Sequence, residues 1–228
     1  MDIKLSYKDK GTGTPLIMLH GNGESNAYFV HQINFFSKKY RVIAIDTRGH
    51  GKTPRGTAPF TIMQFADDLY KFIYKKKFEK VVILGFSDGA NIAMIFALKY
   101  ANKVTALILN SGNLNPNGIK NNIHITLQIA YQLTRFFSKK SRTAKKYMEY
   151  FGLMVKEPNI AMKQLKKIKC PTLVIAGTRD MIKKSHTKRL AVNLKNSELC
   201  FINGTHYIAK EKPKEFNDAV NKFLSRIK

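Results

Sequence analysis

The sequence predicts an α/β fold built on a mostly parallel sheet with helices on its faces. Short apolar, β-branched runs alternate with segments of helical periodicity over most of the 228 residues, as in strands joined by crossover helices. The run over residues 81–85 contains no polar residue, which is typical of a strand covered on both faces. One long stretch interrupts the alternation. We therefore expect a core domain made of residues 1–112 and 170–228, with residues 113–169 as a helical insertion.

The first half of the chain supplies most of the expected strands. They cover residues 3–7, 16–20, 41–46, 81–85 and 105–110. The turn signal Lys10-Gly11-Thr12-Gly13 lies between the first two strands and predicts a hairpin. Apolar residues recur at helical spacing in the intervening segments, which predicts helices over 27–37, 61–74 and 91–100.

The second half holds the insertion and the end of the sheet. Within the insertion only helix-like patterns occur, at residues 123–137, 142–155 and 159–168. The strand pattern then returns at 173–176 and 199–202, and helices are expected over 186–194 and 214–227.

Composition places the chain among ordinary globular proteins, with 44% hydrophobic and 24% charged residues. No apolar run approaches the ~20 residues that a membrane-spanning helix needs, and the N-terminus lacks the apolar region of a signal peptide. We expect a cytoplasmic protein with no membrane span. In that compartment Cys170 and Cys200 are expected to be reduced and to have no chemical role.

The net charge of +25 is the unusual feature of the composition. Binding to nucleic acid, to an anionic membrane surface or to anionic substrates would each favour such an excess. The lysines are scattered along the chain, however, and no DNA-binding or RNA-binding motif accompanies them. This favours a solvated surface and no specific nucleic-acid partner.

Residues 85–89, Gly-Phe-Ser-Asp-Gly, lie between an expected buried strand and an expected helix. A sharp turn there would project the Ser87 hydroxyl beside the N-terminus of the helix, and the flanking glycines would leave room for it. A serine nucleophile needs a base and a carboxylate that orients the base. Asp180 and His206 follow the last two expected strands, so the chain offers them in the order Ser87, Asp180, His206. Taken singly, Asp180 could be a helix cap and His206 a surface histidine.

Acyl transfer also needs donors for the developing oxyanion. One candidate is the backbone N–H of Asp88, at the start of the helix. The other is the backbone N–H of Asn22, in the loop His20-Gly21-Asn22-Gly23 that follows an early strand. The alternative for this loop is an ordinary glycine-rich turn.

Together, the motifs at residues 20–23, 46–53, 85–89, 176–180 and 204–207 resemble those of the α/β-hydrolase fold family. The resemblance implies an eight-stranded, mostly parallel sheet, the Ser-His-Asp triad, and a variable cap formed by the insertion. It also implies that Asp46 and Arg48 are structural. Apolar residues of the cap are expected to pack on the domain beneath, with some facing a cleft.

The Ser-Asp-Gly turn is similar to that of biphenyl-hydrolase-like carboxylesterases that act on amino-acid esters. The Asp88 carboxylate could therefore pair with a substrate ammonium group. The alternative, which we favour, is that Asp88 complements the helix dipole and joins a structural hydrogen-bond network.

The sequence thus predicts a serine hydrolase that cleaves small carboxylic esters through an acyl-enzyme, with no metal or cofactor. Its partner would be a small-molecule ester, and the oligomeric state stays open. A carbon–carbon bond hydrolase or cofactor-free perhydrolase would use the same triad. A non-catalytic binding protein of the same fold is the alternative from another class.

Overall fold

The computed structural model describes residues 2–227, in which seven strands form one sheet of order β1-β3-β2-β4-β5-β6-β7. The strands are β1 (Tyr7–Lys10), β2 (Pro15–Leu19), β3 (Arg41–Ile45), β4 (Val81–Phe86), β5 (Val104–Asn110), β6 (Thr172–Gly177) and β7 (Ser197–Ile202). Only β1 runs antiparallel to its neighbour, and every other pair is parallel. The carboxyl ends of six parallel strands therefore meet at one edge of the sheet.

Two details of the predicted sheet are wrong. The described residues form seven strands rather than the eight that the resemblance implies, and seven is also the number of strand-like runs in the sequence. The expected hairpin is also absent from the described residues, since β1 pairs with β3. Both edges of β2 are occupied by the parallel neighbours β3 and β4, which leaves no position for an N-terminal strand beside it.

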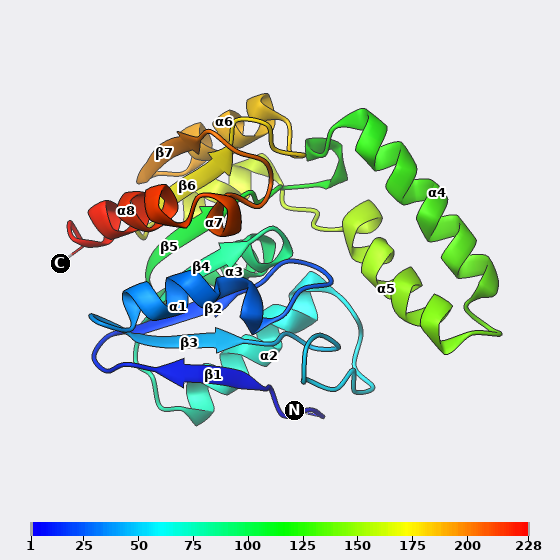
Figure 1. Ribbon diagram of the computed structural model, residues 1–228, viewed down its shortest axis with the longest axis horizontal. Coiled ribbons are helices and arrows are strands. Elements are labelled where there is room, and N and C mark those ends of the chain that lie inside the picture. Colours follow the sequence, from blue (N-terminus) through cyan, green and yellow to red (C-terminus); the bar gives the residue numbers. More distant parts are fainter. Residues whose placement is uncertain (1, 228) are drawn as a thin grey trace.

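Helices cover both faces of the sheet (Figure 1). Residues of α1 (Val30–Phe36) and α8 (Pro213–Leu224) belong to one buried cluster, together with the short η1 (Asn26–Phe29) and α7 (Ile208–Glu211). Residues of α2 (Ile62–Lys75), α3 (Asp88–Lys99) and α6 (Lys184–Asn193) belong to the other. Short η2 (Ala101–Lys103) leads into β5.

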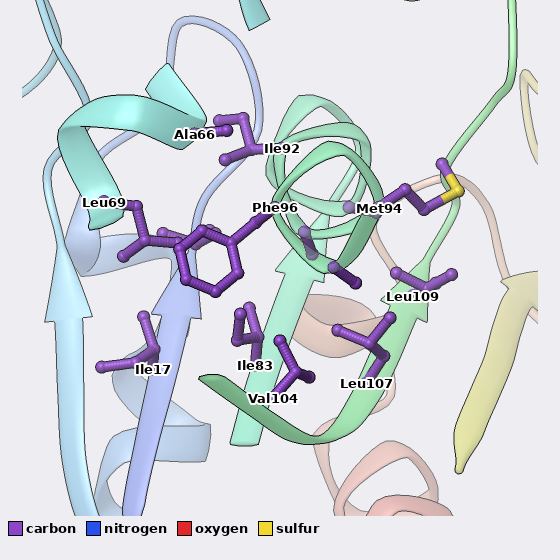
Figure 2. Packing of buried hydrophobic residues seen from close by; sticks show 14 of the residues in the cluster. Ile17, Ala66, Leu69, Ile83, Ile92, Met94, Phe96, Val104, Leu107 and Leu109 are labelled. Carbon is purple, nitrogen blue, oxygen red and sulfur yellow. The ribbon is translucent and has the colours of Figure 1, made fainter. Parts of the chain in front are cut away.

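The core between the sheet and helices α2 and α3 packs against β4, a strand that is buried along its whole length. Ile17 and Ile83 project from adjacent strands toward Phe96 of α3, and Leu69 of α2 closes the same cluster (Figure 2). Each of these side chains is at most 2% exposed. Burial on both faces explains the uninterrupted apolar run in this strand.

The insertion lies between β5 and β6 and contains η3 (Pro116–Gly118), α4 (Asn121–Phe137), α5 (Arg142–Lys156) and η4 (Met162–Lys167). Helices α4 and α5 form an antiparallel hairpin that projects beyond the sheet (Figure 1). The helix expected over 159–168 is only the short 3₁₀ segment η4. The expectation that apolar cap residues pack on the domain beneath is wrong for much of α4, because Ile125, Ile129 and Phe136 are exposed. No helix within residues 2–227 is long and apolar enough to cross a bilayer.

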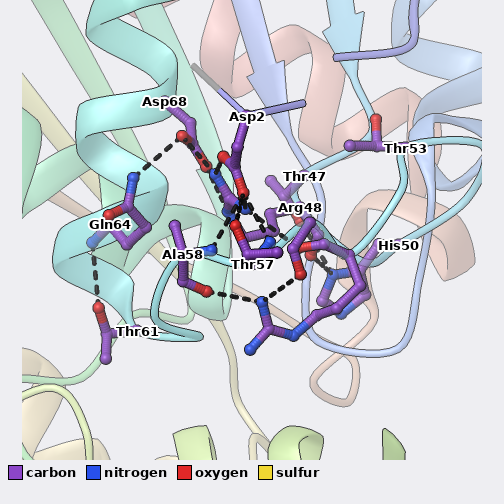
Figure 3. A network of polar contacts seen from close by, with 12 residues as sticks. Asp2, Thr47, Arg48, His50, Thr53, Thr57, Ala58, Thr61, Gln64 and Asp68 are labelled. Atoms are coloured by element: carbon purple, nitrogen blue, oxygen red, sulfur yellow. Dashed lines mark hydrogen bonds and ion pairs between the residues drawn. The ribbon is translucent and has the colours of Figure 1, made fainter. Parts of the chain in front are cut away.

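An ion network around the buried Arg48 fixes the loop after β3 (Figure 3). The Arg48 guanidinium donates to Asp68 at 2.7 and 2.9 Å and to Asp2 at 2.7 and 2.9 Å. Asp46 accepts from the backbone N–H groups of Asn26 and Lys52. These contacts agree with the structural role that the resemblance implies for Asp46 and Arg48.

Candidate active site

The turn from β4 into α3 places Ser87 in a strained backbone conformation, with φ 52° and ψ −117°. A Cβ at Gly85 would collide with the backbone of Gly89, and one at Gly89 would collide with the carbonyl of Leu19. Only glycine fits at these two positions, because strand and helix cross here at close range. The result is a sharp elbow with the serine at the N-terminus of α3, where the helix dipole favours negative charge.

The three side chains of the predicted triad lie together at the carboxyl ends of β4, β6 and β7. His206 Nε2 is 3.1 Å from Ser87 Oγ, and His206 Nδ1 is 2.6 Å from Asp180 Oδ1. A carboxylate only accepts hydrogen bonds, so Nδ1 carries the proton and donates to Asp180. Nε2 is then left as an acceptor for the serine hydroxyl, which is the arrangement that a general base requires.

Asp180 has two further donors that the sequence did not indicate. The Ser111 hydroxyl donates to Oδ2 at 2.5 Å, and the Ile182 backbone N–H donates to Oδ1 at 2.9 Å. Burial alone would raise the pKa of Asp180, but the hydrogen bonds from His206, Ile182 and Ser111 lower it below its usual value. Asp180 therefore stays ionised beside the imidazole.

Ser111 directly follows β5, between β4 and β6 in the sheet. The one signal in the sequence that could have identified Ser111 is its place directly after an apolar, strand-like run, as for the triad residues. The predictive value of that signal is small, because serine is common after strands.

The loop of residues 20–23 lies directly beside the nucleophile. A Cβ at Gly21 would be 3.2 Å from the Cβ of Ser87. Across residues 2–227, the backbone N–H groups of Asn22 and Asp88 donate to no protein acceptor. Both N–H groups therefore belong to residues close to Ser87 and are free of protein acceptors, and their role as oxyanion donors stays a prediction.

His20 shapes this loop. Its Nδ1 lies 2.7 Å from the Gly21 carbonyl, and its Nε2 accepts from the Thr47 backbone N–H at 3.1 Å. Burial lowers the pKa of His20. The ring is therefore neutral, and it joins the loop to the segment after β3. This role is structural, and His20 is not a member of the predicted triad.

The carboxyl group of Asp88 is buried in a polar network. Oδ1 accepts from Asn91 Nδ2 at 3.2 Å, and Asn91 in turn bonds to Asn113. Oδ2 has no partner among the described residues. Burial raises the pKa of Asp88 to about 7, although the Asn91 hydrogen bond opposes this. The side chain is thus only partly satisfied by the structural network.

The cap contacts the predicted oxyanion loop through α5. Asn22 Nδ2 donates to the Tyr150 carbonyl at 2.7 Å, and the Tyr150 hydroxyl donates to the Gly49 carbonyl at 2.7 Å. The Tyr150 ring stacks on His50 with centroids 4.5 Å apart. Arg55 forms a bidentate ion pair with Glu149 at 2.7 and 2.8 Å. These contacts, which the sequence did not predict, join α5 to the core next to Ser87.

Other titratable groups do not extend the site. His31 and His186 lie on α1 and α6, and His124 lies on α4. Among residues 2–227 no group of three or more His, Cys, Asp or Glu residues is placed to hold a metal ion.

Comparisons with known proteins agree with this architecture. A family model described as "alpha/beta hydrolase fold" matches residues 14–146. The AB hydrolase superfamily protein YisY of Bacillus subtilis (strain 168) is 27% identical, with 97% of this chain and 95% of that protein aligned. The human serine hydrolase BPHL is 26% identical over 97% of this chain and 83% of its own length.

A solved structure of a thermophilic esterase from Thermogutta terrifontis superimposes with a TM-score of 0.83 at 22% identity. The match covers 99% of this chain and 94% of the esterase, and at this identity it supports the fold alone. The family model spans more than half of the sequence. This chain belongs to the α/β-hydrolase fold family, among relatives that are hydrolases.

Proposed function

We propose that this protein is a serine hydrolase that cleaves small carboxylic esters through an acyl-enzyme. The observation that carries the proposal is the position of His206, 3.1 Å from Ser87 Oγ and 2.6 Å from the ionised Asp180. A hydroxyl, an imidazole in the required tautomer and an orienting carboxylate are the groups that acyl transfer needs. Similarity to the human serine hydrolase BPHL supports the serine mechanism.

In the first half-reaction, Ser87 Oγ attacks the acyl carbon while its proton passes to His206 Nε2. The carbonyl oxygen becomes an oxyanion beside the backbone N–H groups of Asn22 and Asp88. When the tetrahedral intermediate collapses, the bond to the alcohol oxygen breaks and His206 returns the proton to that oxygen. Asp180 remains ionised and stabilises the imidazolium.

In the second half-reaction, water attacks the acyl-enzyme and gives a proton to His206 Nε2. The second tetrahedral intermediate uses the same two N–H groups. Its collapse breaks the bond to Ser87 Oγ, which regains the proton from His206, and the carboxylic acid leaves. None of these steps requires a cofactor.

A panel of p-nitrophenyl esters from acetate to decanoate tests the proposal. We expect turnover by the native protein and a loss of kcat of at least about 10⁴-fold in Ser87→Ala, as for other serine hydrolases that lose the nucleophile. Ser225→Ala is the matched control, because Ser225 lies at the end of α8 and its hydroxyl donates to the Lys222 carbonyl, far from the triad in the chain. Turnover that survives in Ser87→Ala would exclude the mechanism.

The panel also separates the alternatives. If no ester is turned over, three alternatives remain. The first two, a carbon–carbon bond hydrolase and a perhydrolase, use the same triad, and the third is a non-catalytic binding protein. A phosphonate ester that labels Ser87 covalently distinguishes the first two from the third, since labelling requires an activated serine.

A further inference from the structure

One face of the cap is apolar and covered by no part of the described chain. Helix α4 packs on α5 through the side that carries the buried Tyr131. The opposite side carries the residues that we call the outer face: Ile125, Ile129, Leu133, Phe136 and Phe137. All five are more than half exposed, and Phe136 is 79% exposed. Contiguous exposed apolar side chains at helical spacing mark an interaction surface.

The outer face ends at a strongly basic tip. We define the cap tip as residues 135–146, which join the end of α4 to the start of α5. It contains Arg135, Lys139, Lys140, Arg142, Lys145 and Lys146, all exposed, and no acidic residue. The ion pairs within residues 2–227 include none of the six.

We propose that the outer face and the cap tip dock the protein on an anionic lipid bilayer. Phe136 and Phe137 would enter the interface between headgroups and acyl chains, and the basic residues of the tip would contact the headgroups. An amphipathic helix of this kind lies in the plane of the interface, so the docking requires no membrane-spanning helix. Anionic headgroups attract each lysine or arginine near the surface.

Charge and apolar surface together argue against two other partners for the outer face and the cap tip, a second copy of the chain and a nucleic acid. A second copy would bring one basic surface against another, because the chain has 40 basic but only 15 acidic residues to offer as a complement. A nucleic acid would satisfy the basic residues through its phosphates, but Ile125, Ile129 and Leu133 would stay in contact with water. Of these three partners, only an anionic bilayer pairs with the apolar outer face and the basic cap tip at once.

The absence of tryptophan from the sequence allows a direct test. Phe136→Trp places a single fluorophore in the outer face. Tyr74→Trp is the matched control, because Tyr74 is 70% exposed beside Lys71 and Lys75 but lies near the end of α2, away from the cap. Both are mixed with vesicles of phosphatidylcholine that contain phosphatidylglycerol, with and without brominated acyl chains.

We expect a blue shift and quenching by brominated lipid for Phe136→Trp, and neither for Tyr74→Trp. Equal behaviour of the two variants, or no quenching of Phe136→Trp, would overturn the proposal. A blue shift that grows with protein concentration in the absence of vesicles would also overturn it, because a second copy would then cover the outer face.

Charge variants test the contribution of the tip. Arg135→Gln, Lys139→Gln and Lys140→Gln combined should weaken sedimentation with the same vesicles by about 100-fold. The combination Lys71→Gln, Lys75→Gln and Tyr74→Ser should change it little. If both combinations weaken binding equally, the general excess of charge attracts the protein and the assignment to the cap is wrong. Binding to duplex DNA but not to vesicles would likewise reject it.

Discussion

Asp180 accepts hydrogen bonds from three groups, and only His206 belongs to the predicted triad. The Ser111 hydroxyl occupies the second carboxylate oxygen and so prevents the group from rotating. Ser111 has φ 58°, a conformation that is unfavourable for any residue with a Cβ. Backbone strain at a residue that holds the carboxylate is consistent with a positioning role in the site.

Replacement of Ser111 separates this positioning role from the strain. In Ser111→Ala and Ser111→Gly we expect kcat to fall about tenfold with KM unchanged, because both lack the hydroxyl that orients Asp180. Ser111→Gly should be more stable than Ser111→Ala by about 1 kcal/mol, since glycine accepts the positive φ. Ester kinetics and urea unfolding measure the two effects. Native kcat in either variant would refute the positioning role.

Asp88 gives the stability of the fold a specific dependence on pH. Its pKa is about 7 in the folded protein, against a usual value of 3.8. Folding therefore favours the protonated acid, and the associated stability is present below about pH 4 and is lost as the pH rises through 7. The loss has an upper bound of about 4 kcal/mol, from a difference of roughly three pKa units.

Asp88→Asn, which cannot ionise, should remove this dependence. We expect the variant and the native protein to differ little at pH 4 and the variant to be the more stable at pH 8. Urea unfolding at the two pH values measures the difference. A stability difference that does not change with pH would contradict a buried, ionisable carboxyl. The same variant tests the alternative role: a preference for amino-acid esters that survives in Asp88→Asn excludes an ion pair between Asp88 and the substrate.

Among the elements, the elbow between β4 and α3 depends on close approach of the backbone. Gly89→Ala places a Cβ against the carbonyl of Leu19 in β2, which cannot move without disturbing the sheet. We expect a loss of at least about 2 kcal/mol in stability, since backbone rather than a flexible side chain must shift.

Gly152→Ala is the control for this substitution. Gly152 lies within α5, and its nearest neighbour, Tyr131 Cε2, would be 3.5 Å from the new Cβ, an ordinary contact. The variant should gain about 0.5–1 kcal/mol, because alanine loses less entropy than glycine in a helix. Thermal unfolding of both variants gives the comparison. Equal effects would mean that the elbow is not restricted by its glycines.

At the scale of the whole molecule, the sequence identifies site residues that lie directly after strands. The nucleophile, acid and base each follow an apolar run, and parallel strands bring such ends to one edge. Ser111 also follows a strand, but serine is common at such positions, and its role depends on a positive φ and on a hydrogen bond to Asp180 that the sequence does not show. The predicted hairpin between β1 and β2 is wrong for a related reason. A local turn signal predicts a hairpin, but the neighbours of β2 are set by the whole sheet.

The same distinction applies to the cap. Helical periodicity gives the bounds of α4 and α5 to within about two residues, as expected for strongly periodic segments. Periodicity shows that a helix has an apolar side but not what covers that side. In α4 the apolar residues are divided between a face on α5 and the uncovered outer face.

This division predicts unequal local stability across the molecule. Helix α3 is buried between the sheet and α2, whereas α4 packs mainly on α5 and has one buried residue, Tyr131. Hydrogen exchange from α4 therefore requires only opening of the cap, while exchange from α3 requires loss of the core. In solution without vesicles, we expect amides of α4 to exchange at least about 100-fold faster than those of α3. Exchange measured by mass spectrometry on peptides from the two helices tests this. Equal protection would mean that the cap and the core unfold as one unit.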